Sequence, residues 1–255
     1  MENELIKQAF KLGNSAGVIL PIEWNGKKVA VRLIEKSITQ TVLEILDEKG
    51  LLKSTLGIFL AGSYARGEEN EKSDIDILVI TENISKQLKV GNYEITFIPK
   101  DKLYRLLKKS LYLNALIREA KAILNNELLQ QYKKEASFLS IKSHLREIKS
   151  ISKIHEDSIS IDEGLGEKIS DGIIYSLVLR LRELYLIECM KNNEISSNSK
   201  FIHLLGKISC TKCYESYLRV KNDLKPRVVI PVREARSLIS EIKKRIARLE
   251  HDKEN

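Results

Sequence analysis

Two aspartates, Asp74 and Asp76, stand two positions apart in residues 74–79, whose other members are apolar. Side chains of a strand alternate between its faces, so this spacing places both carboxylates on one face. Carboxylates this close repel each other, and a cation between them removes that cost. Mg²⁺ suits the position because it binds carboxylate and phosphate oxygens together. The spacing therefore predicts a magnesium site that acts on phosphates.

A turn of small residues precedes the aspartates, with ten residues between Ser63 and Asp74. An apolar run ends at Gly62 and Ser63, and a helix start at such a point leaves backbone N–H groups open to a phosphate. Arg66 follows three residues later. Its guanidinium either reaches the phosphates or pairs with Glu68 or Asp74, and the sequence leaves these alternatives open.

A third carboxylate, Glu94, belongs to the next apolar run, residues 93–98. It shares the face of the two aspartates if the two strands are neighbours. In that arrangement two carboxylates hold metal ions and one takes a proton from an attacking hydroxyl. The candidate catalytic and metal-binding residues are therefore Asp74, Asp76 and Glu94, and the candidate phosphate-binding residues are Gly62, Ser63 and Arg66.

The elements that must position these residues form an α/β region. Ser37 is a candidate cap for a helix over residues 38–46, and Gly50 is a stop signal. Short β-branched or apolar runs between turn residues predict four strands. They are residues 57–61, 75–80, 93–98 and 120–124.

The flanking regions have a different character. Beyond about residue 127, long apolar stretches at helical spacing predict a helical bundle, with helices that include residues 173–186 and 233–251. Residues 150–166 and 192–199 are predicted to be surface loops. The first 36 residues predict a small β-hairpin unit, with a turn at 13–17 and a strand at 28–34. Such a unit is too short to bury a core alone and needs the rest of the chain or a second copy.

The predicted fold is thus a short mixed sheet with helices, preceded by a β-hairpin unit and followed by an α-helical bundle. The expected domains are residues 1–36, 37–126 and 127–255. In the 255 residues, 43% are hydrophobic and the formal net charge is +8, which suits a polyanionic partner. No apolar run is long enough to cross a membrane. The three cysteines and the lack of a signal peptide predict a cytoplasmic protein.

A second candidate metal site, for zinc, consists of Cys210 and Cys213 together with Cys189 and His203 upstream. We favour the interpretation that Cys210 and Cys213 are two packed thiols, because a lone CxxC pair within helical sequence is more often this than a metal site.

Taken together, Gly62-Ser63, the gap that follows and Asp74-Ile75-Asp76 resemble the signature of the DNA polymerase β-like nucleotidyltransferases. The longer form, GSYARG followed by SDIDILV, is most similar to the minimal and kanamycin-type members. The resemblance covers about residues 37–126. It implies that Gly62 and Ser63 hold the triphosphate of an NTP such as ATP and that Asp74 and Asp76 bind two Mg²⁺ ions. The third carboxylate falls on Glu94, where the family more often has Asp.

A second resemblance concerns Lys11 to Pro21, which are similar to the swapped-hairpin DNA-binding domains of the AbrB and MazE type. It implies a homodimer, with DNA contacts from basic residues. The candidates are Lys7, Lys11, Lys27, Lys28 and Arg32. A hairpin that only packs on the catalytic region or dimerises is the alternative.

Two functional hypotheses follow. The first is a Mg²⁺-dependent transferase that moves a nucleoside monophosphate from an NTP to an acceptor hydroxyl, with release of pyrophosphate. The second is a DNA-binding regulator or antitoxin-like protein that acts through the hairpin and nucleotidylates a protein partner. The acceptor, whether small molecule, protein or RNA, and the preferred NTP are not fixed by the sequence. Candidates to line an acceptor cleft are Tyr175, Arg180 and Arg182.

Overall fold

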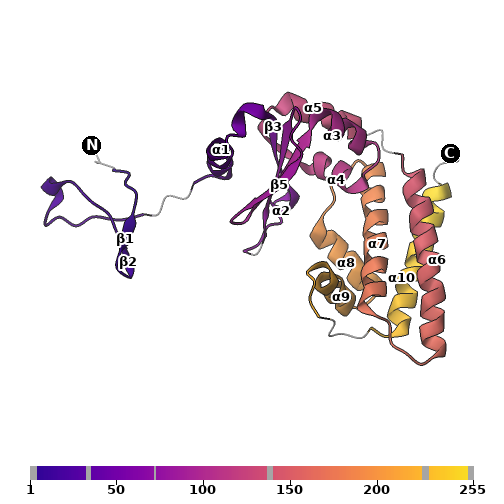
Figure 1. The fold of residues 1–255 in the computed structure, drawn as a ribbon. Coiled ribbons are helices and arrows are strands. Elements are labelled where there is room, and N and C mark those ends of the chain that lie inside the picture. The colour runs from indigo at the N-terminus through magenta and orange to yellow at the C-terminus, as the bar shows by residue number, and fades with distance from the viewer. Residues whose placement is uncertain (1–4, 33–35, 72, 137–139, 226–229, 252–255) are drawn as a thin grey trace. The chain divides into compact units, whose positions relative to one another are not determined.

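The computed structural model describes residues 5–32, 36–71, 73–136, 140–225 and 230–251 (Figure 1). The chain divides into two compact units, residues 1–41 and residues 42–255. No helix of the described residues is long and apolar enough to cross a membrane.

The first unit contains a β-hairpin. Strand β1 (Phe10–Leu12) pairs antiparallel with β2 (Ser15–Gly17), and Gly13 takes a positive φ of 59° in the turn between them. A short 3-10 helix, η1 (Ile22–Trp24), follows. None of residues 5–32 is buried. Its exposed large apolar side chains are Leu5, Ile6, Phe10, Leu12, Ile19, Ile22, Val29 and Val31.

The hairpin prediction is confirmed, but the predicted strand over residues 28–34 is wrong in its described part. Residues 28–32 have no strand structure, and Leu33 and Ile34 lie outside the described residues. The alternating pattern of this segment fits a strand, yet a strand needs a hydrogen-bonding neighbour. Its residues pair with no other strand of the described chain.

The second unit is built on a five-stranded mixed sheet with the order β5-β6-β4-β3-β7. Strands β4 and β6 are parallel, and the other neighbouring pairs are antiparallel. Four of these strands were expected, whereas β5 was not, because its lysine-rich sequence suits an edge strand rather than an apolar one. The strands are β3 (Thr55–Ala61), β4 (Ile75–Thr81), β5 (Lys86–Val90), β6 (Tyr93–Pro99) and β7 (Lys121–Leu124).

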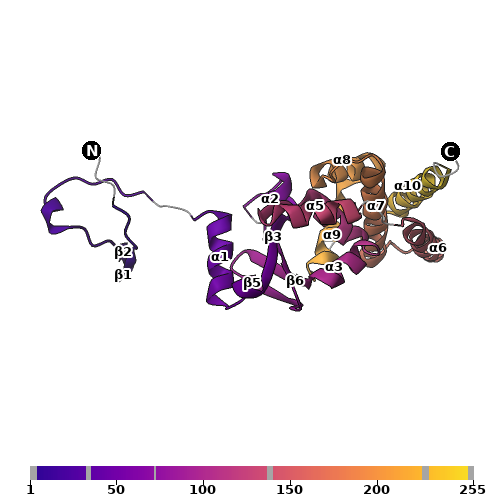
Figure 2. The ribbon, with the colours of Figure 1, turned by 90° about the horizontal axis from the view of Figure 1, so that it is seen from above.

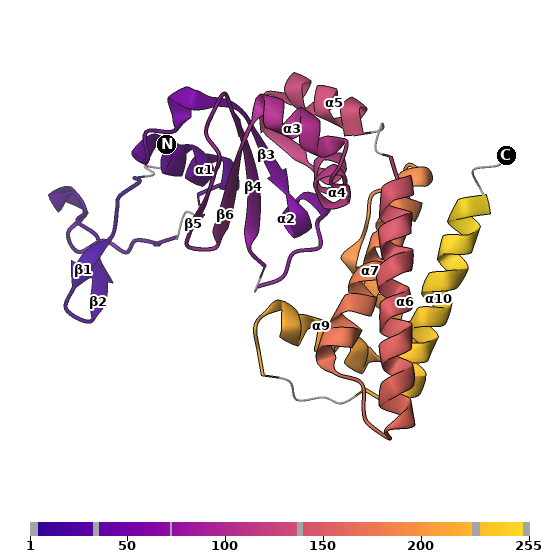
Figure 3. The same cartoon turned by 45° about the vertical axis from the view of Figure 1, so that its right-hand side comes forward.

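Helices cover both faces of this sheet (Figure 3). One face packs through Phe59, Leu78 and Ile80 against the core formed with α3, α4 and α5. Helix α1 lies on the other side, with Val42 and Leu46 fully buried. The bounds are α1 (Ile38–Glu48), α3 (Lys100–Leu107), α4 (Leu111–Glu119) and α5 (Asn126–Glu135), with η2 (Leu52–Ser54) before β3.

The predicted C-terminal helical bundle is confirmed. Helices α6 (Lys142–Gly164), α7 (Asp171–Lys191) and α10 (Val232–His251) run alongside one another (Figures 1 and 2). Helices α8 (Asn198–Ile208) and α9 (Thr211–Lys221) pack beside α7. Leu111 of α4 belongs to the same hydrophobic core, so the sheet region and the helical region are packed together.

The predicted loop over residues 150–166 is wrong, because α6 continues to Gly164. The serines of this segment have modest helix propensity. However, Ile148 and Ile159 are separated by about three helical turns and are both buried in the core, and this packing outweighs propensity. The Cys210 and Cys213 sulfur atoms lie 3.9 Å apart at the start of α9, as packed thiols.

Candidate active site

The central residues of the site form a row across three neighbouring strands. In the register of the sheet, Asp76 of β4 lies opposite Glu94 of β6, and Glu94 lies opposite Lys89 of β5. Paired residues of adjacent strands point to the same face. The structure therefore places Glu94 beside Asp76, as expected if β4 and β6 are neighbours.

Lys89 joins two of the carboxylates. Its Nζ atom lies 2.7 Å from Glu94 Oε1 and 3.4 Å from Asp74 Oδ1. The hydrogen bond to Glu94 is the main reason why the pKa of Lys89 is raised. A positive charge is thus already accommodated between these oxygens. Lys89 was missed because β5 was not predicted, although a lysine on a strand beside acidic residues was the available signal.

Asp76 is the most buried of the three carboxyls. Burial raises the pKa of Asp76, and the nearby charges of Glu94 and Asp74 raise it further. Arg66 and Lys221 act in the opposite direction. Lys221 is the last residue of α9, so a cation of the helical region is near enough to Asp76 to lower its pKa. This residue was also missed, since nothing in the sequence links it to Asp76.

The chemistry of this set fits Mg²⁺, because its donors are carboxylate oxygens and their mutual repulsion favours a bound cation. Among the described residues, no group of three His, Cys, Asp or Glu side chains is close enough to hold a metal ion. Mg²⁺ commonly completes its coordination with substrate phosphates and water. The acidic row therefore suits a metal ion that arrives with a phosphate ligand.

The turn after β3 brings Gly62 into direct contact with this row. Gly62 opens the short helix α2 (Gly62–Arg66) and has a φ of 66°, in the left-handed region. A Cβ atom on Gly62 would lie 2.0 Å from Oδ2 of Asp76. Glycine is thus required twice, by the backbone conformation and by the close approach of the carboxylate. Ser63 follows in the first turn of α2, and its hydroxyl has no partner among the described residues.

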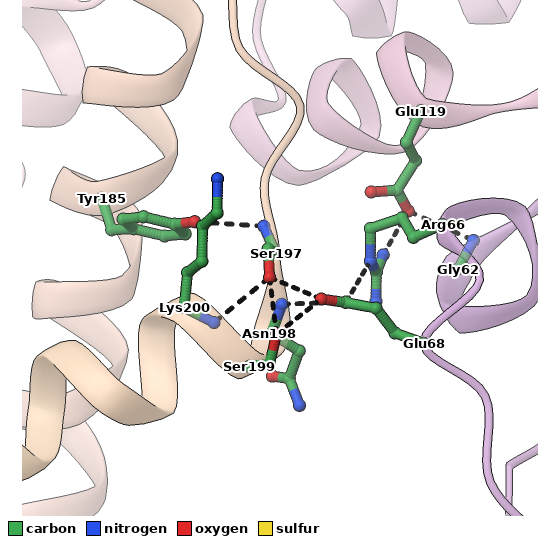
Figure 4. A network of polar contacts seen from close by, with 9 residues as sticks. All are labelled: Gly62, Arg66, Glu68, Glu119, Tyr185, Ser197, Asn198, Ser199 and Lys200. Carbon is green, nitrogen blue, oxygen red and sulfur yellow. Dashed lines mark hydrogen bonds and ion pairs between the residues drawn. The ribbon is translucent and has the colours of Figure 1, made fainter.

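Arg66 is held by two carboxylates (Figure 4). Its Nη1 atom lies 2.7 Å from Glu119 Oε1, and its Nε atom lies 2.8 Å from Glu68 Oε2. Glu119 Oε1 also accepts a hydrogen bond of 3.1 Å from the Gly62 backbone N–H. Of the alternatives for Arg66, the structure shows the pair with Glu68. Because Arg66 also lowers the pKa of Asp76, its charge acts on the acidic row without direct contact.

Glu68 has an unusually acidic carboxyl. Burial by itself would raise its pKa, but hydrogen bonds from Ser197, Arg66 and Asn198 outweigh burial and lower the pKa to about 2. Its ordinary value is 4.5. The ionised form therefore stabilises the fold fully above pH 4.5, and this contribution is lost as the pH falls toward 2.

A pH dependence of stability follows. We expect the free energy of unfolding of the wild type to fall more steeply between pH 5 and pH 2 (roughly the range that spans both pKa values) than that of Glu68→Gln. Glutamine cannot titrate, so its variant lacks this proton linkage. Urea unfolding at several pH values measures the difference. Equal slopes in the two proteins would contradict the assignment.

The three cleft candidates of the helical region are engaged with neighbours in that region. Tyr175 stacks on Tyr217 with ring centroids 5.3 Å apart. The Nη1 atom of Arg180 lies 3.1 Å from Glu183 Oε2. Arg182 lies over the ring of Phe201, 5.4 Å from its centroid. The structure does not bring these side chains together with the acidic row.

The comparisons with known proteins agree with this geometry. Residues 40–163 match the family model described as "Nucleotidyltransferase domain". Residues 40–163 of this chain are thus similar to nucleotidyltransferase domains. The predicted resemblance to nucleotidyltransferases and the prediction of a transferase enzyme are confirmed at this level. The match supports nucleotidyl transfer in general, whereas the resemblance of the N-terminal hairpin to AbrB-type domains stays a prediction.

Two solved structures are similar at low identity. A nucleotidyltransferase-like protein from Exiguobacterium sibiricum has 14% sequence identity and a TM-score of 0.38, over 83% of this chain and 75% of that one. A spectinomycin adenyltransferase from Enterococcus faecialis, solved with ATP and spectinomycin, has 13% identity and a TM-score of 0.42, over 82% of this chain and 98% of that one. No curated protein matches the sequence significantly.

Proposed function

We propose that the nucleotidyltransferase domain transfers a nucleoside monophosphate from an NTP to an acceptor hydroxyl in a Mg²⁺-dependent reaction. The observation that carries this proposal is the in-register row of Asp76 and Glu94, with Asp74 nearby and Gly62 against the Asp76 carboxylate. A phosphate-binding turn and a set of acidic metal ligands are the two parts that this chemistry requires.

In this proposal Gly62 and Ser63 hold the triphosphate, and Arg66 contributes positive charge. Asp74, Asp76 and Glu94 are the candidate metal ligands. Mg²⁺, when bound, neutralises charge on the phosphates and stabilises the charge that develops at the α-phosphorus. Lys221, at the end of α9, lowers the pKa of Asp76, and we assign it an electrostatic role toward the triphosphate.

The reaction forms a bond between the acceptor oxygen and the α-phosphorus and breaks the bond from that phosphorus to the β-phosphate. Pyrophosphate leaves, and the acceptor proton passes to the carboxylate of Glu94. The Lys89 ammonium, 2.7 Å from Glu94 Oε1, holds this carboxylate on the same face as Asp76, where the acceptor would approach.

The acceptor is the open part of the proposal, with Tyr175, Arg180 and Arg182 as candidate contacts in the helical region. Each of the four NTPs, labelled at the α-phosphate, is incubated with the protein, Mg²⁺ and a cell extract. We expect label in one fraction, namely protein, RNA or small molecules, starting with ATP as the donor. No label in any fraction, with the protein folded, would contradict the proposal.

The N-terminal unit favours a second candidate function, DNA binding by a dimer. No residue from 5 to 32 is buried, so its apolar side chains need a partner surface. Five basic side chains of this unit have no carboxylate partner among the described residues. They are Lys7, Lys11, Lys27, Lys28 and Arg32.

Deletion of residues 1–36 tests this second candidate. We expect the shortened protein to lose DNA binding while it retains nucleotidyl transfer. The DNA affinity of the intact protein should fall steeply with salt, because lysine contacts to phosphates release counterions. Fluorescence anisotropy with a labelled duplex at several salt concentrations measures both effects. An intact protein that does not bind DNA would argue against a regulator.

A further inference from the structure

Glu68, two residues beyond the end of α2, contacts the start of a helix about 130 residues later in the chain (Figure 4). Its carboxylate accepts hydrogen bonds from the backbone N–H of Asn198, at 3.0 Å, and from the Ser199 hydroxyl, at 3.0 Å. It also accepts one from the hydroxyl of Ser197, the N-cap of α8. A carboxylate at a helix N-terminus satisfies free N–H groups and interacts favourably with the helix dipole.

The opposite end of the same network is the backbone of Gly62. Glu68 holds Arg66 by its Nε atom, Arg66 holds Glu119 by its Nη1 atom, and Glu119 accepts from the Gly62 N–H. The Arg66 and Glu119 side chains are only 15% and 6% exposed. Charges this buried keep their positions only while all their partners are present. The contacts therefore form one continuous path from α8 to Gly62.

The helical region also anchors its own end of this path. The Ser197 N–H donates to the Tyr185 hydroxyl on α7 at 3.1 Å, and the Ser197 side chain accepts from the Lys200 N–H at 3.1 Å. Ser197 is thus fixed to α7 and α8 before it contacts Glu68. Figure 4 shows Glu68 between this serine and Arg66.

We propose that Glu68 is a positioning residue that couples the phosphate-binding turn to the helical region through Arg66 and Glu119. Docking of residues 197–199 on Glu68 holds the Arg66 guanidinium, and Arg66 in turn orients Glu119 toward the Gly62 N–H. The inference rests on the proposed function, since it gives Glu68 a role in the binding of the NTP. It predicts that a substitution of Glu68 weakens the hydrogen bond of the Gly62 backbone N–H, although the two residues are not in contact.

Amide hydrogen exchange followed by NMR tests this coupling without any need for turnover. In Glu68→Ala we expect the amide of Asn198 to exchange about tenfold faster, because it loses a charged acceptor. We expect a similar increase at Gly62, which Glu68 does not touch. Glu69→Ala is the matched control, because Glu69 is an exposed neighbour with no partner among the described residues. Faster exchange at Asn198 with no change at Gly62 would overturn the proposal.

Steady-state kinetics provide the second readout. In Glu68→Ala the KM for the NTP should rise about tenfold, with a smaller change in kcat, because the turn binds phosphates rather than the reacting hydroxyl. An unchanged KM would overturn the proposal. If Glu68→Ala does not fold, Glu68→Gln replaces it, and smaller effects in the same direction are expected. A wild type without transfer would refute the proposed function, whereas the exchange result would still decide the coupling.

Discussion

Replacement of Asp76 by asparagine is expected to reduce nucleotidyl transfer by about a thousandfold or more, because loss of a metal ligand removes several kcal/mol of transition-state stabilisation. Burial and the charges of Glu94 and Asp74 raise the pKa of Asp76, so the ionised carboxylate is costly to the folded protein without a cation. Asparagine keeps the size of the side chain and removes this repulsion. We therefore expect the free energy of unfolding to stay the same or to rise.

A large loss of transfer without a loss of stability distinguishes a residue that acts in the reaction from one that only supports the fold. Single-turnover transfer from an α-labelled NTP and urea unfolding measure them on the same preparation. Glu82→Gln is the matched control, because Glu82 is an exposed carboxylate just after the same strand. Transfer at the wild-type rate in Asp76→Asn would show that the acidic row does not carry the reaction.

Replacement of Gly62 by alanine is the change with the next largest expected effect. The left-handed φ of 66° costs an alanine about 1–3 kcal/mol of folding free energy. In addition, its Cβ would lie 2.0 Å from Oδ2 of Asp76, so the carboxylate or the turn must move. Because this movement displaces a candidate metal ligand, we expect Gly62→Ala to lose both stability and most of its transfer activity.

Gly91 supplies the control for Gly62. It also has a positive φ, of 58°, but a Cβ at this position would meet nothing within 4 Å. Gly91→Ala should thus lose a similar backbone contribution and keep its activity. Thermal unfolding measures the cost of the positive φ, which both variants share. Transfer rates measure the effect of the close approach to Asp76, which only Gly62→Ala disturbs. Equal activities in the two variants would mean that the approach of Asp76 to Gly62 has no functional consequence.

The sequence was most informative where a local pattern is sufficient. Alternation along residues 75–80 and 93–98 predicted the strands that carry Asp76 and Glu94, and the sheet places the two residues in register. The apolar stretch 173–186 predicted α7, which the structure extends to Asp171–Lys191. In each case the side-chain pattern along one segment was enough to predict the type of element.

Prediction failed where long-range packing decides the outcome. The segment 150–166 is helical because distant residues bury Ser152 and Ile159 on one side of α6, and residues 28–32 are not a strand because no neighbour pairs with them. Within the site, Lys89, Glu119 and Lys221 come from three different elements. Their roles depend on how those elements are brought together, which no local pattern records.

The most direct test of nucleotidyl transfer uses the same NTP labelled at either the α- or the γ-phosphate. With Mg²⁺ and the acceptor fraction, the α-label should become bound to the acceptor, while the γ-label should appear only in pyrophosphate. Both signals should be absent in Asp76→Asn and after chelation of the metal. A γ-label on the acceptor, or release of inorganic phosphate in place of pyrophosphate, would contradict nucleotidyl transfer as the reaction of this protein.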